Sequence, residues 1–320
     1  MPILASLLAA IIPMVLYLYI IWRMDKYERE PLKAVLQHFV WGALGAIGFA
    51  LAGDAFLSYQ FEKVIVDPST LSLVETILVA PFVEEITKGI FLVFTVASLK
   101  FDNLTDGLVY GGAIGLGFGM TENFLYFLSY GTTFHTWVAL VIIRSGFSAV
   151  MHCIATATFG AFLGTAKFSP PVLKVSLPFV GLITAMFIHF LWNFSVSFES
   201  TYTFGFIFLF GIVVAFILVF RSTLRKERKI IVEELQEEVE NKFIPDSYIS
   251  ILSTQRRRRT GWISEELRKD FIKVAVKLAF RKTQYKHSLG KNRQFYSNEV
   301  TKYRGIIQEI IARSLEPIKD

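Results

Sequence analysis

The segment LSLVETILVAPFVEEITKGIFLVFTVASLK, residues 71–100, decides the fold, because it places two acids and a lysine inside an apolar stretch. These residues are Glu84, Glu85 and Lys88, and the next apolar stretch carries another acid, Glu122. At roughly 2.5–3.5 kcal/mol each, four idle charges at the centre of spanning helices would cost on the order of 10 kcal/mol. That cost is about the whole stability of a folded domain. The charged side chains must therefore face the interior of a helix bundle, where they predict a reaction site.

The composition agrees with a membrane protein. Hydrophobic residues make up 53% of the 320 and charged residues 19%, whereas soluble domains have about 45–50% and about 25%. Runs long enough to cross a bilayer, at about 20 residues each, lie near 3–22, 33–53, 71–99, 106–130, 136–166, 172–197 and 203–220. We therefore predict an all-α fold, with a polytopic transmembrane helix bundle of about seven spans over residues 1–220. A small, basic helical tail follows over residues 221–320.

The loops alternate in charge. Basic residues such as Arg23 follow the first span, Lys100 follows the third and Lys167 follows the fifth, while the opposite loops hold only Lys63. After residue 220 the chain carries 23 of its 33 lysines and arginines. By the positive-inside rule, the N-terminus lies outside and the tail in the cytoplasm. The first span has no basic segment before it, so we expect a retained helix rather than a cleaved signal peptide.

The spacing of the first charged cluster predicts contacts within one helix. Glu84 and Lys88 are four residues apart and Glu85 and Lys88 are three apart, so the lysine reaches either carboxylate. Pro81 removes a backbone hydrogen bond just before the cluster, which spanning helices accept mainly near a bend or a polar cavity. Two acids beside one cation predict one protonated acid and one ionised base. The alternative is a structural ion pair that fixes helix packing.

The next span contains a ladder of small residues. Its glycines at a four-residue spacing are Gly107, Gly111, Gly115 and Gly119. Such a ladder lets another helix approach closely, and Glu122 continues the same face three residues later. We expect the helix that carries Glu84 and Glu85 to be that partner. Asn123 offers an amide beside Glu122, either to the site or to helix packing.

Two histidines, His152 and His189, fall inside later spans. His189 shares a helix face with Asn193, and His152 shares one with Arg144 and Ser148. Donors and acceptors on four helices predict a hydrophilic cavity near the midplane of the bundle. A serine nucleophile is disfavoured, because no spanning aspartate is available to orient the histidine.

Together these motifs resemble a known family. In chain order they are EEITK (Glu84 to Lys88), FGMTE (Phe118 to Glu122), the helix of His152, and HFLWN (His189 to Asn193). The combination resembles the PrsW family of glutamic-type intramembrane proteases, and DKYEREP (Asp25 to Pro31) is similar to a loop of that family. The likeness covers about residues 15–197. It implies hydrolysis of a peptide bond within the membrane by a glutamate-activated water, in the manner of CAAX prenyl endopeptidases and bacteriocin-immunity membrane proteins.

The resemblance also implies roles for single residues. Glu84 or Glu85 would be the general base, and Glu122 with His152 would hold the water or act as the acid. The remaining side chains would support them: His189 and Asn193 as donors to the developing oxyanion, and Lys88 and Asn123 as supporting polar groups.

A metal-dependent membrane peptidase is the mechanistic alternative. We expect no cofactor on the main hypothesis, but carboxylates and imidazoles also suit zinc or another divalent metal. If a metal is bound, the expected ligands are Glu85, Glu122, His152 and His189. The pattern H-E-x-x-H is absent. Cys153 is the only cysteine, which excludes an intrachain disulfide and a cysteine-based metal cluster.

Two other classes remain open: a transporter, and a non-catalytic membrane sensor or scaffold with a structural ion cluster. No internal repeat pairs the two halves of the bundle, which argues against a transporter. As substrate, the resemblance implies a single-pass membrane protein, for example an anti-sigma factor in a stress response, and it implies the bacterial plasma membrane as location. In the tail, Arg256 to Arg259 predict binding of anionic lipid headgroups. No motif indicates a nucleic-acid partner.

Overall fold

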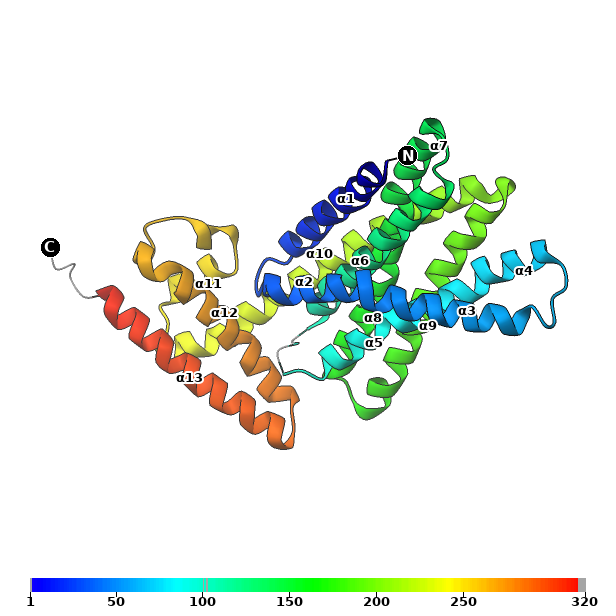
Figure 1. Ribbon diagram of the computed structural model, residues 1–320. Helices are drawn as coiled ribbons and strands as arrows, with labels where there is room; N and C mark the ends of the chain where they lie inside the picture. The colour runs from blue at the N-terminus through cyan, green and yellow to red at the C-terminus, as the bar shows by residue number, and fades with distance from the viewer. Residues whose placement is uncertain (1, 100, 102, 316–320) are drawn as a thin grey trace. The chain divides into compact units, whose positions relative to one another are not determined.

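The computed structural model describes residues 2–99, 101 and 103–315, in which all regular structure is helical (Figure 1). Lys100, used above for the loop charges, lies outside the described residues. The chain divides into two compact units. The first comprises Met1–Asp25 and Arg29–Phe220, and the second comprises Lys26–Glu28 and Arg221–Asp320.

The first unit is a bundle of long helices. In chain order its elements are α1 (Ile3–Met24), α2 (Leu32–Val40), η1 (Trp41–Ala46), α3 (Ile47–Phe61), α4 (Pro68–Val74), η2 (Glu75–Val79), α5 (Ala80–Val96), α6 (Leu104–Tyr130), α7 (Phe134–Ile143), η3 (Arg144–Ser148), α8 (Ala149–Lys167), α9 (Pro171–Ser197), η4 (Glu199–Thr201) and the first half of α10 (Tyr202–Glu240). Several of these elements join end to end into longer helices. Hydrogen bonds from Ser69 and Thr70 lower the pKa of Asp67, the cap of α4, to about 2, so this cap stays ionised.

Within the part of the chain that the structure describes, five helices are long and apolar enough to cross a membrane. They are Ile3–Met24, Leu32–Phe61, Phe134–Lys167, Pro171–Ser197 and Glu199–Glu240. The prediction of an all-α, polytopic membrane bundle is therefore confirmed. The other two predicted spans are also helical, as α5 and α6. The charged cluster makes α5 less apolar, and the glycines with Glu122 do the same for α6.

The glycine ladder of α6 packs against α8, so the predicted partner, the helix of Glu84 and Glu85, was wrong. A Cβ atom added at Gly107, Gly111 or Gly115 would lie 2.0–2.4 Å from a backbone carbonyl oxygen of α8. The fit is reciprocal, because a Cβ at Gly160 of α8 would lie 2.0 Å from the Gly107 carbonyl oxygen. This close approach sets α6 beside the helix of His152.

Three helices of the bundle contain a π-helical segment: η1, η2 and η3. Such segments leave backbone groups without their usual partner and often occur at functional sites. Side chains of neighbouring helices bond two of the carbonyls: the Thr121 hydroxyl donates to Ala43 at 2.7 Å, and the Asn193 amide donates to Thr76 at 2.8 Å. Pro81 comes two residues after the end of η2, so the irregularity expected near this proline takes the form of a π-helical segment.

The second unit is a small helical domain with its own core. It contains the end of α10, then α11 (Asp246–Leu252), α12 (Glu265–His287) and α13 (Gly290–Leu315). Leu235 of α10, Phe271 and Leu278 of α12 and Ile307 of α13 meet in this core. The buried Glu238 carboxylate accepts hydrogen bonds from Lys282 at 2.6 Å and from Arg304 at 2.7 Å. An apolar core and a buried ion cluster therefore hold these helices together.

One arginine of the predicted lipid-binding run points inward. Arg257 is 5% exposed, donates to the Lys26 carbonyl at 2.6 Å and lies over the ring of Tyr27. Arg256 and Arg259 are exposed, and the side chain of Arg258 is outside the described residues.

Candidate active site

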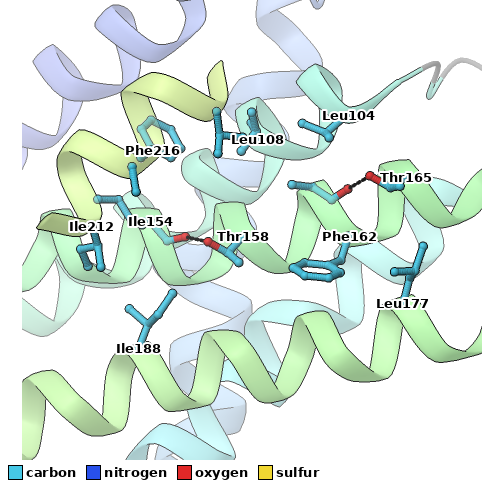
Figure 2. Close-up of a pocket in the computed structure, with 13 residues that line it drawn as sticks. Leu104, Leu108, Ile154, Thr158, Phe162, Thr165, Leu177, Ile188, Ile212 and Phe216 are labelled. Carbon is cyan, nitrogen blue, oxygen red and sulfur yellow. Dashed lines mark hydrogen bonds between the residues drawn. The ribbon is translucent and has the colours of Figure 1, made fainter. Parts of the chain in front are cut away.

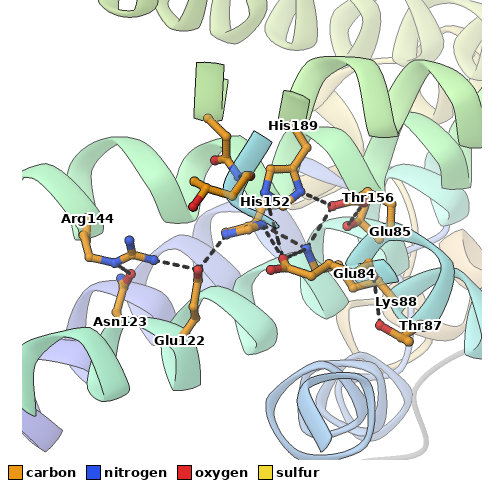
Figure 3. A network of polar contacts seen from close by, with 12 residues as sticks. Glu84, Glu85, Thr87, Lys88, Glu122, Asn123, Arg144, His152, Thr156 and His189 are labelled. Carbon is orange, nitrogen blue, oxygen red and sulfur yellow. Dashed lines mark hydrogen bonds and ion pairs between the residues drawn. The ribbon is translucent and has the colours of Figure 1, made fainter. Parts of the chain in front are cut away.

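The site is built around the Lys88 ammonium group, which is fully buried (Figure 3). Its Nζ donates to Glu84 Oε2 at 3.1 Å and to Glu85 Oε1 at 2.8 Å, as the spacing on α5 predicts. It also lies 2.9 Å from His152 Nδ1 of α8 and 3.8 Å from the centre of the Phe118 ring of α6. One cation thus joins α5, α6 and α8.

Both oxygens of Glu85 carry hydrogen bonds. Oε1 accepts from Lys88 and from His189 Nδ1 at 3.1 Å, and Oε2 accepts from the Thr156 hydroxyl at 3.1 Å. The residue is 1% exposed. Because three of its about four acceptor sites are already used, Glu85 is the weaker candidate for taking a proton from water. Among the described side chains, the Glu84 carboxylate accepts one hydrogen bond, from Lys88.

Glu122 lies on the other side of His152, as Figure 3 shows. Its Oε2 accepts from His152 Nε2 at 2.8 Å and pairs with Arg144 Nη2 at 2.7 Å. Arg144 also donates to Asn123 Oδ1 at 3.1 Å and lies over the Tyr126 ring. Glu122 is therefore fixed between Arg144 and Nε2 of His152.

The carboxylates assign the tautomers of the two neutral histidines. A carboxylate only accepts hydrogen bonds, so the ring proton of His152 lies on Nε2, facing Glu122, and that of His189 lies on Nδ1, facing Glu85. The remaining nitrogens carry lone pairs, and that of His152 Nδ1 accepts from the Lys88 ammonium at 2.9 Å. His152 Nδ1 lies 3.9 Å and His189 Nε2 lies 4.0 Å from Glu84 Oε2.

Glu84, His152 and His189 form a group that fits a divalent metal ion. Each offers one ligand atom, these atoms all lie within 4.8 Å of one another, and all three residues are buried. Two neutral imidazoles and one carboxylate make a donor set typical of catalytic zinc. Metal-binding histidines usually donate their other N–H to a carboxylate, as both histidines do here.

This ligand group differs from the predicted one. The sequence analysis placed Glu85 and Glu122 with the two histidines as ligands. In the structure Glu122 binds His152 Nε2 and Glu85 binds His189 Nδ1, which we call the outer nitrogens. Glu84 faces the other nitrogen of each ring, the inner one. Asn193, expected near the oxyanion, donates instead to the backbone of η2. Asn123 contacts Arg144, and its Nδ2 has no hydrogen-bond partner among the described residues. The structure thus brings six of the eight predicted site residues into one cluster: Glu84, Glu85, Lys88, Glu122, His152 and His189.

Two polar side chains near the site were missed. Thr156 lies one helical turn after His152 on α8, so an i, i+4 search from that histidine would have found it. Asp54 of α3 lies close enough to Lys88 and Glu122 for charge interactions. Its Oδ1 is buried without a hydrogen-bond partner in the described part of the chain. Asp54 was overlooked because the predicted span ended one residue before it.

A family model described as "PrsW family intramembrane metalloprotease" matches residues 30–221. The chain belongs to the PrsW family. It is an intramembrane protease of that family and a multi-pass membrane protein, as the resemblance implied. The family description says metalloprotease, where the sequence analysis favoured a glutamic type. The matched region ends near the boundary between the two units, so the C-terminal unit lies outside it.

Several curated relatives bear the name Protease PrsW. The protein of Bacillus subtilis is 28% identical over 194 residues, which are 60% of this chain and 83% of the relative. That of Geobacillus kaustophilus is 32% identical over 164 residues, 50% of this chain and 66% of the relative. That of Shouchella clausii is 27% identical over 224 residues, 69% of this chain and 95% of the relative. No solved structure matches the chain.

Proposed function

We propose that this PrsW-family protein is a metal-dependent intramembrane protease in which Glu84, His152 and His189 hold a divalent ion. One observation carries the proposal: each histidine donates its outer N–H to a carboxylate and turns its other nitrogen toward Glu84. A structural ion cluster centred on Lys88 would also use His152 Nδ1 as an acceptor, 2.9 Å from Nζ. It assigns no role to His189 Nε2, which faces Glu84 Oε2 at 4.0 Å.

When bound, a divalent ion supplies a Lewis acid that polarises the scissile carbonyl. The protein positions the ligands for it: Glu122 and Arg144 orient His152, while Glu85 and Thr156 orient His189. Lys88 Nζ donates to Glu84, Glu85 and His152, so its three N–H bonds are used. It therefore acts on the group through its positive charge. Burial of these side chains keeps bulk water away from them.

Metal content and cleavage, measured on the same samples, test the proposal. The purified full-length protein in detergent should bind about one zinc ion per chain. It should also cleave single-pass membrane substrates, lose that activity in strict EDTA treatment and regain it with zinc. His152→Ala and His189→Ala should lose the ion, whereas the exposed Glu199→Gln should keep it. Activity that survives chelation would instead support a glutamate-activated water, and protein without metal or activity would mean a structural cluster.

We further propose that α5 and α6 also cross the bilayer, which gives seven spans. The basic residues then place the N-terminus outside and residues 221–320 in the cytoplasm, as a tail attached to the protease bundle. The resemblance supports a bacterial plasma membrane as location.

We also propose a class of substrate for the site and a partner for the tail. A site buried among spanning helices suits a single-pass membrane protein, such as an anti-sigma factor, whose scissile bond lies within or close to the bilayer. The exposed Arg256 and Arg259 suit anionic lipid headgroups at the cytoplasmic face.

A further inference from the structure

The membrane-spanning unit contains an apolar cavity between α6, α8, α9 and α10, with a volume of about 330 Å³ (Figure 2). Its walls include Leu108 of α6, Ile154 and Phe162 of α8, Ile188 of α9, and Ile212 and Phe216 of α10. Pockets that bind small molecules have volumes of about 300–1,000 Å³. The cavity is therefore large enough for a ligand.

The walls offer no polar group that is not already used. The two threonines that line the cavity bond within their own helix: Thr158 donates to the Ile154 carbonyl at 2.8 Å and Thr165 donates to the Ala161 carbonyl at 2.9 Å. Figure 2 shows both bonds. Apolar cavities of this kind stay dry and take apolar ligands. An empty one would also forfeit the dispersion contacts of its walls.

The cavity lies beyond the part of α10 that packs tightly on the bundle. Near its start α10 packs tightly: a Cβ at Gly205 would lie 2.3 Å from Ser195 Oγ, and the rings of Phe206 and Phe147 are 4.8 Å apart. The cavity wall on α10 begins at Ile212, about 10 Å further along the helix axis. The opening is thus a gap between one spanning helix and its neighbours.

The apolar lining selects the occupant. The walls present hydrocarbon side chains and two hydroxyls that already donate within α8, so they suit a hydrocarbon chain, which needs no polar partner. Since α8, α9 and α10 are among the spanning helices, the surrounding bilayer supplies such chains. We propose that the cavity binds one acyl chain of a membrane phospholipid.

This binding site lies directly behind the proposed active site. Ile154 comes two residues after His152 on α8, and Ile188 directly precedes His189 on α9. An acyl chain in the cavity packs against both helices that carry these histidines. It stabilises their positions without contacting the substrate.

Native mass spectrometry of the full-length protein tests this site. The protein is reconstituted with phosphatidylethanolamine and phosphatidylglycerol and then exchanged into detergent. We expect the parent protein to retain one phospholipid per chain. Ala215→Phe, which fills the cavity from α10, should lose it. Val214→Phe is the matched control, because Val214 precedes Ala215, is 39% exposed and does not line the cavity; this variant should retain the lipid.

Retention by a folded Ala215→Phe, or no retained phospholipid in the parent, would overturn the proposal. Folding is checked by the thermal unfolding midpoint. If Ala215→Phe does not fold, Ala161→Leu, which fills the cavity from α8, decides by the same measurement. Since lipid retention requires no proteolysis, this result does not depend on the proposed protease activity.

Discussion

At the residue scale, the two nitrogens of His152 have different neighbours. Nε2 lies against Glu122, which Arg144 also holds. Nδ1 lies 2.9 Å from Lys88 Nζ, in the group formed with Glu84 and His189. A carboxylate on the outer nitrogen fixes the tautomer, orients the ring and makes the inner nitrogen a better ligand. On the proposed metal mechanism Glu122 is a positioning residue, whereas the sequence analysis expected Glu122 with His152 to hold the water or act as the acid.

Glu122→Gln should lower zinc affinity about 10- to 100-fold, because outer-shell partners of this kind usually have effects of that size. The amide keeps the size of the side chain but loses its charge, which leaves Arg144 without its counter-ion. The affinity is measured by competition with a chromophoric chelator. Glu199→Gln removes a charge from the exposed η4 and should bind zinc like the parent. Equal affinity in Glu122→Gln would show that this carboxylate does not act through His152.

The same residues show how far sequence reasoning reaches. The contacts of Lys88 with Glu84 and Glu85 follow from spacing on one helix, and the structure contains both. The bonds from His152 to Glu122 and from His189 to Glu85 cross between helices. They depend on which helices meet and in which register. The spacing of residues within one segment does not determine either. For this reason the sequence analysis grouped Glu85 and Glu122 with the two histidines, whereas the structure groups Glu84 with them.

At the element scale, α6 carries the packing that brings the site together. The sequence predicted its close-packed glycine face. It did not identify the correct partner helix, because any helix with small residues fits such a face. The partner is α8, whose Gly160 gives a matching close approach. The π-helical segments were also beyond prediction, because they arise from how hydrogen bonds redistribute inside the packed bundle.

Gly107→Ala should destabilise the protein by about 1–3 kcal/mol, the usual cost of overpacking. The new methyl group would lie 2.0 Å from the Gly160 carbonyl oxygen, so α6 and α8 must move apart. The unfolding midpoint in detergent measures this effect. Gly211→Ala on α10 is the control, since a Cβ there has nothing within 4 Å, and alanine favours a helix over glycine. A midpoint as high as that of the control would mean that this helix contact is loose.

At the scale of the whole molecule, the crossing of the bilayer depends on α5 and α6. The apolar runs of the sequence predicted seven spans, whereas five helices among the described residues meet the length and apolarity needed to cross a membrane. The difference has a physical origin: α5 carries the charged cluster and α6 carries the glycines and Glu122. Helices that hold a buried polar site are the least apolar spans of a bundle. On the proposed topology of seven spans, α5 and α6 are the two that this measure of apolarity leaves out.

Cysteine labelling of intact cells with a membrane-impermeable maleimide decides between the two counts. The parent provides a low background, because its only cysteine, Cys153, is 4% exposed. With the N-terminus outside, Val66→Cys before α4 and Thr132→Cys after α6 should be labelled whether or not α5 and α6 cross. Ser98→Cys, between α5 and α6, separates the cases. If both helices cross, we expect it to be labelled only after permeabilisation; labelling in intact cells would mean that neither helix spans the membrane.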